Sequence, residues 1–355
     1  MLKIEGLHTK SIPPTECYLE LVFRLKESTR WAKAHHEVAD GQIQLVAPRS
    51  LELIKQMPAP DFRPKLNQIS SHILQIAGSE TTWRFNVLHG TLVSWQNNST
   101  ELIHTPPVLD FYRAVTDNDA PSRFGQDWIG NRLNQTQCHI KNVTWSETPE
   151  QVTIEVTSRI APPVLEWSVD TTFVYTFTAN QLSIKVKGTP RGNFLPKTFA
   201  RIGLTLSLNN INTASWFGRG PGESYRDKKL SQRFGNYSLA IDKLFVDYEF
   251  PQETSNRTDV RWVAFSPPPA ETHNKPALKA HFGDLKEASF TAMHYRTADL
   301  DKATHPYELH KLKRRETVVR LDWAHHGLGT GSCGPATLPE YELRSEPFEY
   351  EVLLE

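Results

Sequence analysis

The sequence predicts an all-β protein, because period-two alternation, frequent turn clusters and a shortage of helical periodicity occur together. Alternation of apolar and polar residues places one face of a strand on a core and the other in solvent. Clusters of Pro, Gly, Asn and Asp separate these runs, as expected for turns between antiparallel strands. No βαβ alternation is visible, which excludes a doubly wound sheet or a complete (β/α)8 barrel within this chain. We therefore expect an antiparallel β-sandwich.

The strand candidates share this alternation along the whole chain. In residues 172–178 it puts Phe173, Tyr175 and Phe177 on one face, and three threonines with Val174 on the other. Similar runs occupy residues 19–25, 83–87, 151–157, 181–187, 204–208, 316–323 and 348–353. Helical spacing is confined to two short stretches, residues 126–133 and 306–312.

A proline-rich stretch divides the chain. Because proline cannot donate to a sheet ladder, residues 48–65 are predicted to be a linker. This linker separates an N-terminal piece, residues 1–47, from a body formed by residues 66–355. A piece with two or three strands is too small to make a stable sandwich by itself. The prolines of the stretch are Pro48, Pro58, Pro60 and Pro64.

Composition excludes several classes of partner. The 355 residues carry 40 Lys+Arg and 40 Asp+Glu, so the formal net charge is zero. Nucleic-acid binders are usually basic and membrane-surface binders carry basic amphipathic stretches, so we expect neither partner. No apolar run suits a signal peptide or a membrane span. Three cysteines are too few for a disulfide framework, and we expect a cytoplasmic protein.

Residues 329–334 match G-x-G-x-x-G by letter, but Pro335 and Pro339 follow where a dinucleotide site needs a helix. We predict a loop between strands instead. The pairs His35–His36 and His325–His326 lack metal-binding spacing and are interpreted as surface or hydrogen-bonded buried histidines.

Two acidic groups remain open as acid–base candidates, because paired carboxylates follow no spacing rule in sequence. One is Glu223, and the other is the Asp117–Asn118–Asp119 trio. Side-chain-capped turns explain the trio equally well without a catalytic role.

A family resemblance begins at residues 111–119, FYRAVTDND. This segment resembles the F-x-R-A-P-x-D-N-D segment of the β-galactosidases of glycoside hydrolase family 2, with Val115 in place of the proline. Further segments follow in the family's order: residues 200–204 (ARIGL), 216–227 (WFGRGPGESYRD), 248–258 (YEFPQETSNRT) and 321–335 (LDWAHHGLGTGSCGP). They resemble its A-R-I-G-L, W-x-G-x-G-P-x-E-x-Y-x-D, Y-x-x-P-x-E-x-G-x-R and D-x-x-x-x-G-x-G-x-x-S-W-x-P segments. Ser255 replaces the glycine of the third of these, and Cys333 replaces the tryptophan of the last, as in some members.

The resemblance implies the fold of both parts of the chain. Residues 66–355 would form the family's small-chain domain, a large antiparallel β-supersandwich that is galactose mutarotase-like. Residues 17–45 resemble the last strands of the immunoglobulin-like domain that precedes it. The N-terminal piece would therefore be an incomplete immunoglobulin-like β-sandwich.

The resemblance also implies which residues meet substrate. In the family the catalytic glutamates, Mg²⁺ and a monovalent cation lie on an upstream (β/α)8 barrel, so we expect no catalytic residue and no metal ligand in this chain. A mobile loop beside the sugar pocket maps onto residues 119–125, which can close over substrate. At Cys333 the family's stacking tryptophan is lost, and a thiol offers less contact area to a sugar ring. The substrate-binding residues implied are Asp119, Ser122, Arg123, Phe124, Gly125, Ser332 and Cys333.

The function implied is that of the C-terminal, small-chain part of a β-galactosidase. It would complete the active-site rim for retaining hydrolysis of terminal β-D-galactosides such as lactose. The expected partner is a large chain or an upstream barrel region, within an oligomer, and the isolated chain is expected to be inactive. Two alternatives stay open: a free-standing carbohydrate-binding or mutarotase-like domain, and a non-functional fragment of a longer enzyme.

Overall fold

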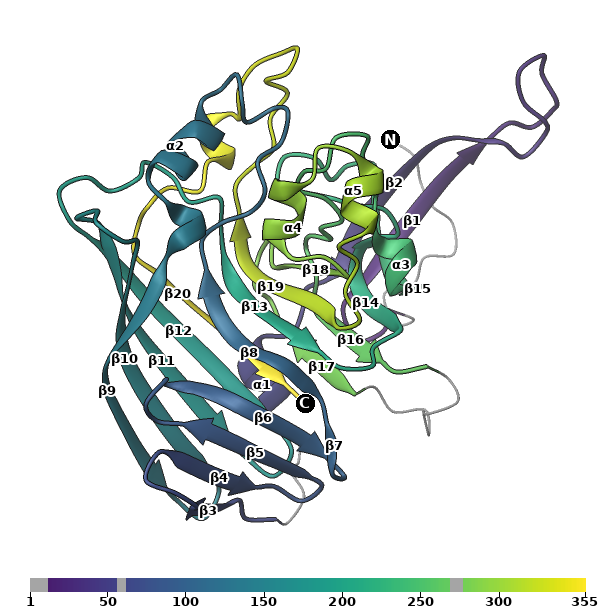
Figure 1. Ribbon diagram of the computed structural model, residues 1–355. Coiled ribbons are helices and arrows are strands. Elements are labelled where there is room, and N and C mark those ends of the chain that lie inside the picture. Colours follow the sequence, from purple (N-terminus) through teal and green to yellow (C-terminus); the bar gives the residue numbers. More distant parts are fainter. Residues whose placement is uncertain (1–11, 56–61, 269–276) are drawn as a thin grey trace.

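A computed structural model gives the structure of the protein and describes residues 12–55, 62–268 and 277–355 (Figure 1). Within these ranges every strand pairing is antiparallel, which confirms the all-β prediction. The predicted strand runs are all observed as strands. Residues 1–11 of the predicted N-terminal piece, and Pro58 and Pro60 of the predicted linker, lie outside the described residues.

The largest sheet has nine strands and forms one layer of the body. In spatial order these are β15 (Arg233–Ala240), β14 (Thr213–Gly220), β16 (Trp262–Ser266), β17 (Leu278–His281), β20 (Phe348–Leu354), β12 (Leu182–Arg191), β11 (Ser168–Phe177), β10 (Val152–Ala161) and β9 (Gln137–Glu147).

Two smaller sheets cover this layer. One contains β18 (Ser289–Met293), β19 (Thr317–His325), β13 (Arg201–Leu208) and β8 (Ile103–Asp110). The other contains β3 (Lys65–Gln68), β4 (Ile73–Ala77), β5 (Thr81–Asn86), β6 (Thr91–Asn97) and β7 (Thr100–Glu101). Aromatic contacts join the layers: Phe85 of β5 meets Tyr175 of β11 at 5.0 Å, and Phe290 of β18 meets Trp216 of β14 at 5.5 Å, both between ring centres.

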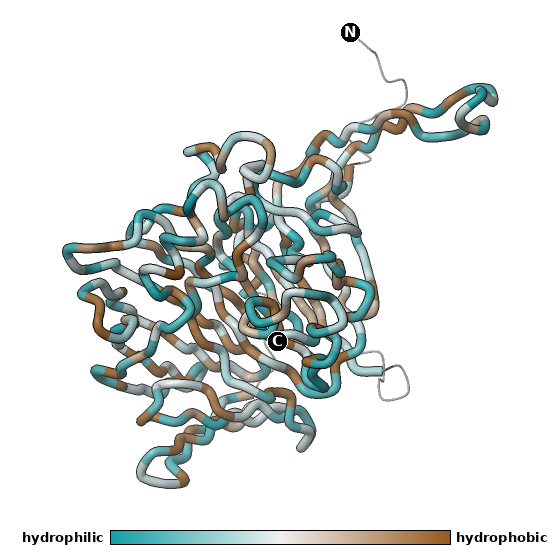
Figure 2. The backbone as a smooth tube through the Cα atoms, turned by 45° about the horizontal axis from the view of Figure 1, so that its top comes forward, coloured by the Kyte–Doolittle hydropathy of each residue, from teal (hydrophilic) through white to brown (hydrophobic). Residues whose placement is uncertain are grey.

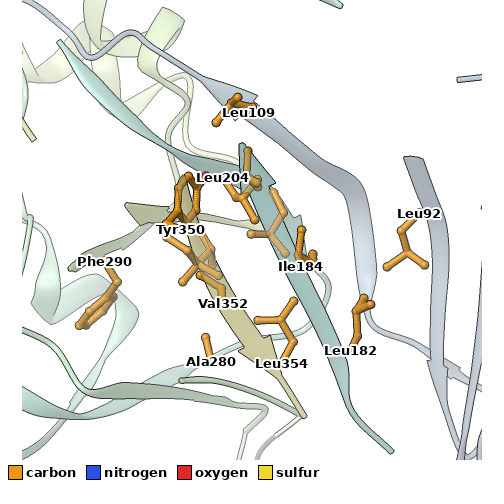
Figure 3. Close-up of a cluster of buried hydrophobic side chains, with 14 of the residues drawn as sticks. Leu92, Leu109, Leu182, Ile184, Leu204, Ala280, Phe290, Tyr350, Val352 and Leu354 are labelled. Carbon is orange, nitrogen blue, oxygen red and sulfur yellow. The ribbon is translucent and has the colours of Figure 1, made fainter. Parts of the chain in front are cut away.

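The core fills the space between these layers. Alternation on β12 and β20 turns residues such as Ile184 and Val352 toward residues such as Leu204 of β13, and Figure 3 shows these side chains in one cluster. Each fully buried side chain of this size contributes about 1.5–3 kcal/mol relative to leaving it in water. The layers are therefore held together by the faces that the sequence alternation marks as apolar.

The N-terminal strands β1 (Cys17–Arg24) and β2 (Glu37–Val46) form a separate two-stranded sheet that projects from the body (Figures 1 and 2). The side chain of Gln42 donates to the carbonyl of Phe234 (2.9 Å) and accepts from its N–H (2.7 Å), as a neighbouring strand would. The ring of Tyr18 stacks on that of Phe234 at 4.7 Å. A two-stranded ribbon is marginal in water, so these contacts with β15 fix its position.

Helices are short. The predicted helix at residues 126–133 is α2 (Phe124–Gly130), followed by the 3-10 turn η2 (Leu133–Gln135). It ends early because the Asn131 side chain caps the carbonyl of Asp127 (2.8 Å) and Arg132 takes a left-handed φ of 55°. The predicted turn at residues 306–312 is α5 (Pro306–His310).

The other helices are α1 (Leu51–Lys55), α3 (Ile241–Leu244), α4 (Thr297–Lys302) and the 3-10 turn η4 (Pro339–Tyr341). Helix α1 lies inside the predicted linker, where its buried Leu51 packs against the backbone of Gly283. In the ranges described, no helix is both long enough and apolar enough to cross a membrane.

Candidate functional site

Two loops that are far apart in sequence meet at one end of the body. The first, residues 117–125, leads into α2, and the second, residues 326–335, follows β19 (Figure 1). The Asn118 side-chain oxygen accepts from both the N–H (3.1 Å) and the hydroxyl (2.7 Å) of Ser332. Its NH₂ group donates to the carbonyl of Gly329 (3.0 Å). We call residues 117–125 and 326–335 together the loop pair.

The close approach of the two loop backbones also explains why residue 331 of the second loop is a glycine. A Cβ atom at Gly331 would overlap the carbonyl oxygen of Asn118. Only glycine lets the two backbones come this near. Gly329, with φ of 64°, provides the left-handed residue that starts the same turn.

Asp119 anchors the first loop from below. Its fully buried carboxylate accepts two hydrogen bonds from Arg113 (2.7 and 3.1 Å). It also accepts from the N–H and the hydroxyl of Thr116 (2.7 and 2.8 Å). Asp119 was predicted to bind substrate directly, but the structure places its side chain in the interior, where it positions the loop.

The remaining predicted residues of the first loop differ in exposure. The Ser122 hydroxyl is half-buried and donates to the carbonyls of Asn118 (3.1 Å) and Asp119 (3.0 Å). Gly125 is buried against Val115, the residue that replaces the family's proline. Arg123 is exposed and has a left-handed φ of 66°. Of these three residues, Arg123 is the most exposed to solvent.

Phe124 is half-buried and packs against the histidine that begins the second loop. Its ring centre lies 4.5 Å from that of His326, which also contacts Trp128 at 5.2 Å. The Nδ1 atom of His326 accepts from the N–H of Leu343 (3.1 Å). Burial lowers the pKa of His326 to about 3. This ring is therefore neutral and works as a packing element between the loops.

The second loop is shaped by a carboxylate that sequence reasoning did not select. Asp227 accepts from the N–H groups of Leu328 (2.9 Å) and Gly329 (2.7 Å). The carbonyl of Thr330 accepts from the N–H of Cys333 (3.1 Å) and closes a tight turn. Ser332 and Cys333 are both exposed at its tip. The available signal for Asp227 was its place as the last residue of the segment 216–227.

Further ion pairs join charged residues in the motif segments or directly next to them. Arg320 makes two hydrogen bonds to Glu253, at 2.8 and 2.9 Å, and both residues are buried. Arg201 bonds Asp322 (2.8 Å) and Asp110 (2.9 Å). Buried ion pairs are costly to break, so these residues fix the floor of the site.

Glu223 is also used structurally. It accepts from the N–H of Ser255 (2.9 Å) and from the hydroxyl of Tyr248. Ser255 itself has a φ of 70°, which explains why a glycine is expected at this position. In the described parts of the chain, no group of three or more His, Cys, Asp or Glu residues could hold a metal ion.

Comparison with known proteins identifies the family. Residues 77–354 match the sequence model described as beta galactosidase small chain, and residues 2–46 match beta-galactosidase, domain 4. The chain belongs to the β-galactosidase small-chain family. The resemblance found in the motif segments is thereby confirmed.

Relatives of this small-chain domain are full β-galactosidases. Those of Kluyveromyces lactis, Vibrio cholerae and Arthrobacter sp. are 29%, 28% and 29% identical, over 96%, 97% and 93% of this chain. The chain spans about a third of their length, 32% in each case. Among solved structures, a galactose mutarotase-like protein from Lactobacillus casei matches with a TM-score of 0.43 at 11% identity, over 80% of this chain and 99% of that one. A putative aldose 1-epimerase from Escherichia coli matches with a TM-score of 0.39 at 11% identity, over 80% and 98%.

The small-chain domain thus presents a preorganised surface. Arg123, Ser332 and Cys333 offer a guanidinium, a hydroxyl and a thiol to a ligand, on loops that buried ion pairs hold in place. Such groups can orient a polar substrate and exclude water from it.

Proposed function

We propose that this small-chain domain forms part of the active-site rim of a β-galactosidase whose catalytic groups lie in a large chain or an upstream barrel region. The observation that carries this proposal is the loop pair, in which Asn118 joins the segments that bear Arg123 and Cys333. Such a rim would shape the entrance of the active-site pocket, while the groups that cleave the glycosidic bond would come from the partner region.

The carboxylates near the loop pair support the second half of the proposal. Asp119 and Glu253 are buried in ion pairs with arginines, and Glu223 is held by Ser255 and Tyr248. A retaining glycosidase needs two carboxyl groups facing one sugar. We assign those two groups, Mg²⁺ and a monovalent cation to the partner region.

Features of the β1–β2 sheet favour a partner region that covers it. That region could belong to the same polypeptide or to a separate large chain. Its exposed side chains include Phe23, Val38, Ile43 and Trp31, the last 67% exposed. Both strands also leave an outer edge without a strand partner among the described residues. Apolar faces and open edges of this kind are normally covered. The partner would complete the immunoglobulin-like sandwich that the domain 4 match suggests.

In this proposal the assembled enzyme hydrolyses terminal β-D-galactosides such as lactose with retention. It acts as an oligomer in cytoplasmic lactose catabolism. This chain positions the sugar through the loop pair, and Cys333 gives the galactosyl ring a smaller contact surface than an aromatic side chain would.

Co-expression tests the proposal. The chain is produced with a candidate large chain, and hydrolysis of a chromogenic β-galactoside is compared for the complex, the large chain alone and this chain alone. We expect activity in the complex only. If the isolated chain were as active as the complex, the two catalytic carboxyl groups would have to lie in this chain, which would contradict the proposal.

A large chain that is fully active by itself would instead contradict the rim role. The isolated chain is also assayed for mutarotation of freshly dissolved α-D-galactose, followed by optical rotation. Mutarotation above the spontaneous rate would favour a mutarotase-like activity over the rim role.

A further inference from the structure

Several buried polar atoms have no hydrogen-bond partner among the residues that the structure describes, and three of them belong to side chains close to Glu253. These three are Nε of Arg113, the hydroxyl of Tyr225 and Nε2 of His325. The three side chains are 0%, 1% and 3% exposed. Buried polar groups in folded proteins are almost always paired, with protein or with ordered water. Three such atoms in one region therefore need an explanation.

The three side chains lie close to one another and to Glu253. The ring centres of Tyr225 and His325 are 5.3 Å apart. Nε2 of His325 lies 3.8 Å from Oε1 of Glu253. The charge of Arg113 is near enough to act on both rings, and it adds to the effect of burial, which lowers the pKa of His325 well below its usual value. The four side chains come from segments that are distant in sequence.

The protonation of these groups follows from their other contacts. Nδ1 of His325 lies 3.2 Å from the carbonyl of His326, which can only accept, so Nδ1 carries the proton. Nε2 of the neutral ring is therefore an acceptor. Oε1 of Glu253 is a second acceptor. It receives one hydrogen bond, from Arg320 (2.9 Å), and can accept another. Two acceptors cannot bond to each other, so each of them needs a donor from another group.

The remaining two groups, Nε–H of Arg113 and the hydroxyl of Tyr225, are both able to donate. The terminal nitrogens of Arg113 bond Asp119 and the carbonyl of Ala114, which leaves Nε–H unused. The Tyr225 hydroxyl can donate or accept. A cation does not fit beside the Arg113 guanidinium, and an anion does not fit beside the Glu253 carboxylate. Water is the small species that can serve donors and acceptors together.

We propose that these four groups face one small space, and that an ordered water molecule in it accepts from Nε–H of Arg113 and the hydroxyl of Tyr225 and donates to Nε2 of His325 and Oε1 of Glu253. Arg113 holds the first loop through Asp119, and His325 is the last residue of β19, directly before the second loop. The water therefore connects the bases of both members of the loop pair. It belongs to the framework that positions them.

A crystal structure of the whole chain, at a resolution that shows ordered waters, tests this site directly. We expect a density peak within hydrogen-bond distance of all four groups. If the Tyr225 hydroxyl instead bonds Glu253 or His325 with no peak between them, the proposal is overturned. This test needs no variant and does not depend on activity.

The Tyr225→Phe variant tests the role of the water, with Tyr112→Phe as the matched control. Tyr112 is also buried, at 4% exposed against 1% for Tyr225, but its hydroxyl has a protein partner, because it donates to Asp301 at 3.1 Å. In Tyr225→Phe we expect loss of the peak and backbone hydrogen exchange on the order of tenfold faster in both loops. In Tyr112→Phe we expect the peak and the loop exchange to stay unchanged. An unchanged peak in Tyr225→Phe, or equal effects of the two substitutions on the loops, would overturn the proposal.

Discussion

The side-chain oxygen of Asn118 accepts two hydrogen bonds from Ser332, one from its backbone N–H at 3.1 Å and one from its hydroxyl at 2.7 Å. These residues are 214 positions apart in sequence. One carboxamide thus orders the tip of the second loop from the first. Because the same side chain also donates to Gly329, neither loop can shift without breaking a bond to the other.

Asn118→Ala should release the second loop while leaving the fold intact. Loss of these hydrogen bonds is expected to cost about 1–2 kcal/mol of stability. The larger effect should be local, with backbone exchange at Ser332 on the order of tenfold faster. Hydrogen exchange followed by mass spectrometry measures this.

Asn131→Ala is the control for that exchange experiment. Its side chain caps the end of α2 by donating to Asp127 at 2.8 Å, without touching the second loop. Equal exchange of the peptide around Ser332 in the two variants would show that Asn118 does not hold the loop.

Asp119→Ala should destabilise the whole domain, because it leaves the guanidinium of Arg113 buried without its counter-charge. Removing one partner of a buried ion pair typically costs about 3–5 kcal/mol. Urea denaturation gives the free energy of unfolding. The neighbouring Asp117→Ala changes an exposed carboxylate and should stay within about 0.5 kcal/mol of the parent. Similar losses in both variants would contradict the anchoring role.

Gly331→Ala should force the two loops apart, since the new Cβ would overlap the carbonyl oxygen of Asn118. Overpacking of this kind costs about 1–3 kcal/mol. Gly130→Ala is the matched change, because a Cβ there meets no atom within 4 Å and alanine favours the helix. Thermal unfolding should show a lower Tm for the first variant and an equal or higher Tm for the second. A parental Tm for Gly331→Ala would mean that the backbones of Gly331 and Asn118 do not approach each other this closely.

Stability should fall as the solution becomes acidic, in part because of His326. Its pKa is about 3 in the folded protein, against 6.5 for the unperturbed group. Between these values the unfolded chain binds a proton that the folded chain does not bind. Stability is therefore present above pH 6.5 and is lost as pH falls toward 3, by about 1.4 kcal/mol per pH unit for one such group.

Urea denaturation between pH 7 and pH 5 measures this slope. His326→Asn retains an acceptor for the N–H of Leu343 and removes the titrating ring, so its slope should be smaller, by an amount that approaches one proton near pH 5. His89→Asn makes the same substitution at an exposed position and serves as the control. An unchanged slope in His326→Asn would show that its ring is protonated in the folded protein.

Cys333→Trp should tighten binding of galactoside analogues to the assembled enzyme, if the loop pair forms its rim. The exposed position accommodates an indole, whose face can pack on a sugar ring. We expect inhibition constants about three- to tenfold lower, from about 0.5–1.5 kcal/mol of added contact. Cys138→Trp, at an exposed position on β9, should leave them unchanged. Equal constants for the parent and Cys333→Trp would remove Cys333 from the sugar pocket.

Sequence reasoning succeeded where the signal is local and repeated. Alternation in residues 172–178 gave β11 and its buried face, since side chains of a strand point to opposite sides. Sequence reasoning was less accurate for the end of a helix, where a single capping side chain decides the last residue. Helix α2 ends at Gly130 because Asn131 caps it and Arg132 turns left-handed, which helical spacing alone does not reveal.

Site residues were harder to predict for a related reason. Asp119 and Gly125 were grouped with Arg123 by position in one loop, yet the first two are buried and the third is exposed. Exposure depends on what packs beneath the loop. Asp119 faces Arg113, and Gly125 faces Val115.

The sequence alone determined the strand content, the antiparallel class and the family, because these depend on short-range alternation and on motifs that keep their order along the chain. Only the tertiary structure decided which motif residues can meet a ligand. Asn118 and Ser332 become partners, and Arg113, Glu253 and His325 become neighbours, because β8, β19 and the loops around them converge at one end of the sandwich. Contacts between segments so far apart depend on how the sheets pack, and no local pattern records them.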